Sequence, residues 1–154
     1  MRRGRQSGHA MIELAFSATV MAACLAGTFQ FGYSFYIYDQ LVSAVGNAGR
    51  YAVSRTIRAA TPEDLEKGKA AIRNMVVYGD PHPDADAVPV APDLKPENVL
   101  VSYVAGEREG APSAIDVAIA DYNVHAVFGA VTLKGRPAVE FPFVGRYAAS
   151  ESEP

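Results

Sequence analysis

The sequence has little that could cross-link the chain or attract nucleic acid. Its one cysteine, Cys24, cannot form an intramolecular disulfide. The first 38 residues hold three of the 14 basic and one of the 17 acidic residues, which leaves 11 basic and 16 acidic residues in the remainder. Nucleic-acid binding needs a clustered basic face that releases counterions from phosphates. The composition therefore predicts no nucleic-acid partner.

Signatures of catalysis are also missing. No phosphate-binding glycine loop, zinc-binding helix motif or nucleophile elbow occurs. His82 lies in the acidic stretch 80–86, which could hold a cation but lacks the glycine and the bidentate glutamate of a calcium loop, so a solvated loop is expected. His125 has no nucleophile motif beside it and is expected to be a partly buried structural residue. We predict no enzymatic activity, no cofactor and no metal site.

What the sequence does contain is one long apolar run, residues 10–38, in which Glu13 is the only charged residue. As a helix, this run would measure about 40 Å, more than the hydrocarbon core of a bilayer. Three arginines precede it, and positive flanks stay in the cytoplasm. We expect a single-pass protein with a basic cytoplasmic leader (1–8), a membrane segment (9–38) and a domain on the far side (39–154).

Two processed forms of this segment are alternatives. A secretory signal usually has an apolar region of about 7–15 residues that ends in small residues, whereas here aromatic residues continue the run. A lipoprotein would use Met21–Cys24 as its attachment box, where Met is a poor first residue. We expect a retained helix, with Cys24 as a small buried residue at a helix contact.

Small residues follow one another at a spacing of four along the membrane segment: Ala15, Thr19, Ala23 and Gly27. Such a face lets another helix approach the backbone closely. An alanine-rich span also tolerates lipid on all sides, so both interpretations remain open.

The helix is expected to continue beyond the membrane, over about 39–58. Apolar residues keep helical spacing there while polar residues take the other side. The apolar positions are Tyr33, Ile37, Leu41, Ala44, Ala48, Tyr51 and Ala52. One helix from His9 to Arg58 would be about 75 Å long.

Glu13 is the most informative residue of the membrane segment. A carboxylate in a membrane helix costs free energy unless it is shallow, protonated or paired. Cleavage after Gly8 would make His9 the new N-terminus and place Glu13 fifth. The new α-amino group could then pair with Glu13 of a neighbouring subunit and fix the axial register. The alternative is an unpaired carboxylate near the membrane surface, with Gly8 as a flexible residue.

This arrangement resembles type IV pilin-like proteins, whose leader ends in Gly before an apolar helix with Glu at position five. The continuation resembles the TadE family of minor pseudopilins from tight-adherence pilus systems over roughly residues 7–53. The residues that carry the likeness are Gly32, Tyr33, Gln40, Gly46, Gly49 and Arg50. The resemblance implies a bacterial inner-membrane protein with a periplasmic domain. It also implies membrane lipid, a prepilin peptidase, other pilins or pseudopilins and pilus assembly proteins as partners.

The rest of the chain predicts a small α+β domain. Thr61 and Pro62 start a helix over about 62–78, and an acidic loop (79–97) follows. Strands are expected over about 98–105, 113–122 and 137–145, the first two joined by a turn with Gly106 and Gly110. The third includes Phe143, and Pro142 confines it to a sheet edge or a bulge. Residues 124–133 could be a short helix or an irregular connection.

The sequence thus predicts an α+β, pilin-like fold, in which a long N-terminal transmembrane helix and a second helix pack on a small antiparallel sheet. The leading hypothesis is a non-catalytic minor pseudopilin that supports pilus biogenesis and adhesion. The alternative is a membrane-anchored periplasmic binding module unrelated to pili.

Overall fold

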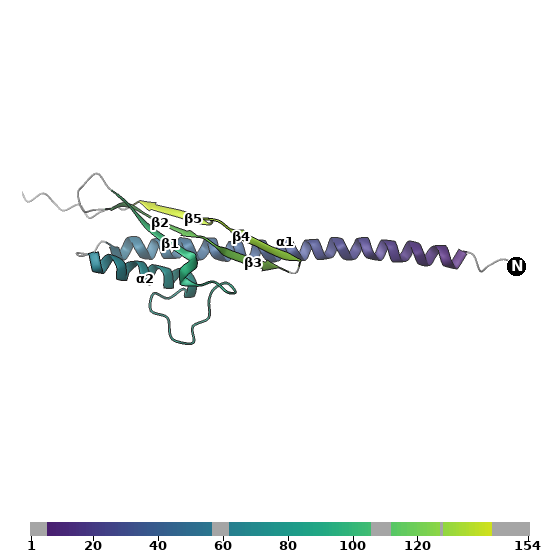
Figure 1. Ribbon diagram of the computed structural model, residues 1–154, viewed down its shortest axis with the longest axis horizontal. Coiled ribbons are helices and arrows are strands. Elements are labelled where there is room, and N and C mark those ends of the chain that lie inside the picture. The colour runs from purple at the N-terminus through teal and green to yellow at the C-terminus, as the bar shows by residue number, and fades with distance from the viewer. Residues whose placement is uncertain (1–5, 57–61, 106–111, 127, 143–154) are drawn as a thin grey trace, which may run out of the picture.

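The computed structural model describes residues 6–56, 62–105, 112–126 and 128–142. The fold is α+β and pilin-like, as the sequence predicts: a long N-terminal helix, a second helix and small antiparallel sheets packed together (Figure 1). Some expected features lie outside the described residues: the leader arginines, the helix end at Arg58, Thr61, the turn with Gly106 and Gly110, and Phe143.

Helix α1 (Gln6–Thr56) is unbroken over 51 residues. At 1.5 Å per residue it is about 75 Å long, and no proline interrupts it. Its C-terminal half buries most of the apolar stripe predicted from the sequence, namely Ile37, Leu41, Ala44, Ala48 and Ala52, together with Val45. Of the other two predicted positions, Tyr51 is half-buried and Tyr33 is exposed. Its N-terminal half projects alone, away from the rest of the chain (Figure 1). One helix therefore has two very different surroundings.

Helix α2 (Pro62–Tyr78) runs back along the C-terminal half of α1 (Figure 1). It buries Ile72, Val76 and Val77. Gly79 follows with φ +74°, a left-handed conformation that glycine adopts without steric cost, and its N–H donates to the Met75 carbonyl at 3.1 Å. This glycine ends the helix.

The main sheet is antiparallel in the order β1-β2-β5, made of β1 (Val99–Ala105), β2 (Pro112–Ile119) and β5 (Ala138–Pro142). A short 3-10 turn, Pro96–Asn98, leads into β1. The middle strand β2 is the most buried. Pro142 ends the edge strand β5, where a missing N–H does not interrupt the ladder.

The described residues of the segment 124–133, which are 124–126 and 128–133, form neither a helix nor an irregular connection. They belong to a two-stranded sheet, β3 (Tyr122–Ala126) with β4 (Gly129–Leu133). Tyr122 and Val124 are buried while the residues between them are exposed, the alternation of a half-buried strand. This alternation also makes the expectation for His125 wrong, because the side chain lies on the exposed face of β3.

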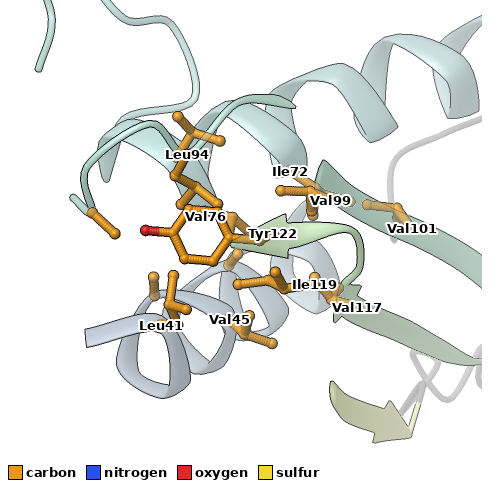
Figure 2. Packing of buried hydrophobic residues seen from close by; sticks show 14 of the residues in the cluster. Leu41, Val45, Ile72, Val76, Leu94, Val99, Val101, Val117, Ile119 and Tyr122 are labelled. Atoms are coloured by element: carbon orange, nitrogen blue, oxygen red, sulfur yellow. The ribbon is translucent and has the colours of Figure 1, made fainter. Parts of the chain in front are cut away.

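The core joins α1, α2, both sheets and the end of the acidic loop. Figure 2 shows Tyr122 and Ile119 between Leu41 and Val45 from α1 on one side and Ile72, Val76 and Leu94 on the other, with Val99 beside Ile72. Each fully buried aliphatic side chain contributes about 1.5–3 kcal/mol relative to an exposed one. The domain is thus built on the C-terminal half of α1 itself.

The two parts of the loop 79–97 differ in how far they are exposed to solvent. His82, Asp84 and Asp86 are exposed in its first part. Its second part is attached to the core, because Leu94 is 1% exposed and the Tyr122 hydroxyl donates to the Pro92 carbonyl at 2.7 Å.

Candidate membrane and subunit interface

The first half of α1 is apolar on all sides and nothing in the described chain covers it. Met11, Ile12, Leu14 and Phe16 are between 64% and 72% exposed. Among the described residues, α1 is the one helix long and apolar enough to cross a membrane by length and composition. A helix that is apolar all round is stable only when a membrane or other protein covers it. This half of α1 therefore suggests a single membrane anchor.

Gly8, His9 and Glu13 lie on this uncovered half, close to its start. The helix begins at Gln6, so the Gly8–His9 peptide bond is in its first turns, where backbone N–H groups lack helical partners and the helix opens most easily. Four residues, or about 6 Å of helix rise, separate His9 from Glu13. Within the described residues the Glu13 side chain makes no hydrogen bond or ion pair. Its carboxylate is therefore available for a group from outside the chain.

The small-residue face is also uncovered. Ala15, Thr19 and Ala23 are exposed, and a Cβ added at Gly27 would meet nothing within 4 Å. The Thr19 hydroxyl donates to the Ala15 carbonyl at 2.8 Å, so it adds no unsatisfied polar group to the segment. Cys24, expected at a helix contact, is exposed in the single chain. The face can be covered equally by lipid or by a second helix.

The residues of the family motif separate into two groups. Gly32 and Gly46 have open space where a Cβ would stand, and Tyr33 and Arg50 are exposed. Gly49 differs from them because it is buried in the protein's own core. Gly49 therefore makes a contact within the domain, whereas Gly32 and Gly46 leave space at the surface of α1.

Gly49 allows β5 to lie directly on α1. A Cβ at this position would overlap the ring of Phe141. Among the motif glycines, Gly49 is thus the one at which the sheet packs directly against the helix backbone. Gln40 lines a separate, more polar groove of about 300 Å³ between α1 and α2, with Met75 and Gly79.

The structure adds a feature that the sequence did not reveal, an apolar groove between α1 and the β3–β4 hairpin. It measures about 250 Å³ and is lined by Phe31, Ser34, Phe35, Tyr38, Val124, Val131 and Leu133. The hairpin is attached here by a hydrogen bond of 2.8 Å from the Phe128 N–H to the Gln30 side-chain oxygen. The available sequence signal was the alternation of Val124 with its neighbours.

Tyr122 connects this hairpin to the core. Burial raises the pKa of its hydroxyl above the ordinary value of 10.0, and Tyr33 and Asp93 nearby raise the pKa further. The hydroxyl therefore stays protonated and keeps its hydrogen bond over the physiological range.

The acidic loop offers no metal centre in the described part of the chain, where no three His, Cys, Asp or Glu side chains come together. The Asp80 carboxylate accepts a hydrogen bond from the His82 backbone N–H at 2.8 Å and so stabilises the local turn.

In the described residues, an uncovered apolar helix continues as the core helix of a small α+β domain, which is a pilin-like arrangement and suggests a single N-terminal membrane anchor. In comparison with known proteins, residues 8–50 match the family model described as TadE-like protein, and the rest of the chain lies outside that match. The match confirms the resemblance predicted from the sequence. Neither the curated proteins nor the solved structures gave a match.

Proposed function

We propose that the protein is a minor pseudopilin of a tight-adherence pilus system that supports pilus assembly and surface adhesion without catalysing a reaction. The observation that carries the proposal is the TadE-like match over residues 8–50, which includes all of the helix that the fold leaves uncovered. The part of the chain most similar to pilus proteins is thus also the part that needs an external partner.

The proposed topology follows from charge. The leader carries three arginines and should remain in the cytoplasm, so the folded domain would lie in the periplasm. Prepilin peptidase would cut between Gly8 and His9, in the first turns of α1. The new ammonium group and Glu13 of an adjacent pilin or pseudopilin would then pair at the membrane surface.

Pairing of this kind would set the axial position of neighbouring subunits. Opposite charges attract more strongly where lipid lowers the dielectric constant. Glu13 has no partner within the described residues, so the pairing would not compete with a contact inside the chain.

The first test is the mass of the protein extracted from membranes of cells that contain the matching peptidase. We expect an N-terminus at His9. An N-terminus still at Met1 would contradict the proposal.

The second test compares Glu13→Gln with Asp39→Asn, the same change at another exposed position of α1 beyond the uncovered half. Glu13→Gln should reduce co-purification with other pilus subunits and surface attachment, while Asp39→Asn should retain both. Thermal unfolding of the domain should not change in either variant. A silent Glu13→Gln would instead favour a membrane-anchored binding module with an unpaired carboxylate.

A further inference from the structure

The β3–β4 hairpin lies where the uncovered part of α1 ends. It is separate from the three-stranded sheet and extends along α1 toward the N-terminal half (Figure 1). Its turn contacts the helix at Gln30, which accepts the hydrogen bond from the Phe128 N–H. The hairpin tip and Gln30 are therefore at the same height along α1.

Helix geometry relates this height to a membrane. From Ala10 to Phe29 there are 20 helical residues, or about 30 Å, the thickness of a typical hydrocarbon core. Gln30 then stands at the boundary between acyl chains and headgroups. The next charged residue on α1, Asp39, follows about 14 Å further along the helix, beyond the headgroups.

The surface at this boundary is apolar on both elements. Phe128 is 68% exposed and Val131 is 52% exposed on the hairpin, and Phe31 and Phe35 are similarly exposed on α1. None of the residues that line the groove between them is charged.

Charged residues lie at the other end of the hairpin. Lys134 and Arg136 are exposed and follow the end of β4, about 16 Å from the tip for a five-residue strand. A groove of similar size near that end includes Asp93, Lys95 and Asp121 in its lining. The strongly exposed apolar side chains of the hairpin, Phe128 and Val131, thus lie toward the end near the anchor, and the charged residues follow the other end.

We propose that the β3–β4 hairpin is a second, shallow membrane contact, in which Phe128 enters the boundary between headgroups and acyl chains and lipid fills the groove beside Phe31 and Phe35. The occupant is lipid because the groove continues the apolar surface of the anchor at the height where the hydrocarbon core ends. This inference depends on α1 as the anchor and not on the pilus role.

The contact would fix how the domain sits on the membrane. A single helix allows a domain to rotate about the helix axis, whereas an aromatic side chain inserted beside that helix selects one side. The domain would then present a constant face to its partners.

The test uses a chain that has no tryptophan of its own. Phe128→Trp places one fluorophore at the hairpin tip. Val88→Trp is the matched control, since Val88 is an exposed apolar residue, at 80%, in the loop 79–97. Each full-length variant is reconstituted into phosphatidylethanolamine and phosphatidylglycerol vesicles that contain lipids brominated at shallow or deep positions.

We expect emission at shorter wavelength and severalfold stronger quenching for Phe128→Trp than for Val88→Trp, with shallow bromines more effective than deep ones. Quenching should not change when the protein is diluted into excess lipid. Equal emission and quenching for the two variants would overturn the proposal. A short-wavelength emission without bromine quenching, lost on dilution, would overturn it in favour of a second copy of the chain as the occupant. Cleavage after Gly8 and the effect of Glu13→Gln are measured separately, so the pilus proposal can fail while this one holds.

Discussion

At the scale of single residues, the glycines of α1 differ in their surroundings although they look alike in the sequence. Gly49 is buried beneath the Phe141 ring, whereas Gly46, one turn earlier, faces open space. Helical spacing predicted the buried stripe around them, because that signal is local. The contact of Gly49 with Phe141 could not be predicted, since it joins residues far apart in the chain and depends on how the sheet docks.

These two glycines give a matched pair of substitutions. Gly49→Ala should destabilise the protein by about 1–3 kcal/mol, because the added methyl group overpacks against Phe141. Gly46→Ala should stabilise it by about 0.5–1 kcal/mol, because alanine is the better helix former and meets no neighbour. Denaturant unfolding of both full-length variants in detergent, followed by circular dichroism, measures the difference. Equal effects would mean that β5 does not lie on α1 as described.

At the scale of elements, the sequence was informative where patterns are long. The start of α2 follows from the proline at its first position, and α1 follows from seven apolar positions at helical spacing. The β3 and β4 strands have five residues each, too few for their alternation to stand out from loop sequence. Leu94 lies in a proline-containing loop with no periodicity, so its burial depends on tertiary contacts alone.

The attachment of the loop 79–97 to β3 can be tested through Tyr122. Tyr122→Phe should cost about 1 kcal/mol at neutral pH, because the Pro92 carbonyl loses its hydrogen-bond donor. Tyr78→Phe is the control, since the Tyr78 hydroxyl makes no hydrogen bond within the described residues.

The same variant should change the response to alkaline pH. Folding raises the pKa of Tyr122, so the unfolded chain loses this proton at a lower pH than the folded chain does. The stabilisation from Tyr122 is complete below pH 10.0, the unfolded value, and is lost as pH rises toward the folded pKa. Unfolding free energies measured between neutral and alkaline pH should therefore fall more steeply for the wild type than for Tyr122→Phe. Parallel curves would show that the hydroxyl is not buried.

At the scale of the whole molecule, the boundary between anchor and domain is set by packing and not by composition. The apolar run extends to Tyr38 in the sequence, yet the hairpin already contacts α1 at Gln30 and Ile37 is 3% exposed in the core. We therefore propose that the domain begins near Gln30. Composition alone cannot show this boundary. Residues 30–38 supply apolar side chains to the groove and to the core, so the apolar run continues past the boundary without a change.

Two fragments test this boundary. A fragment of residues 30–154 should be more stable than one of residues 39–154, because the shorter one loses the burial of Ile37, about 1.5–3 kcal/mol, and the Gln30 contact with the hairpin. Thermal unfolding in mild detergent measures both. Ile37→Ala in the longer fragment should reproduce part of the loss. Identical thermal unfolding midpoints for the two fragments would mean that the domain begins after Tyr38.

The unbroken course of α1 has a mechanical meaning. No proline or other break separates the uncovered apolar half of α1 from the half that packs inside the domain. A displacement, tilt or rotation of the N-terminal half of α1 should therefore be transmitted directly to the folded domain, which should move with it as one rigid unit.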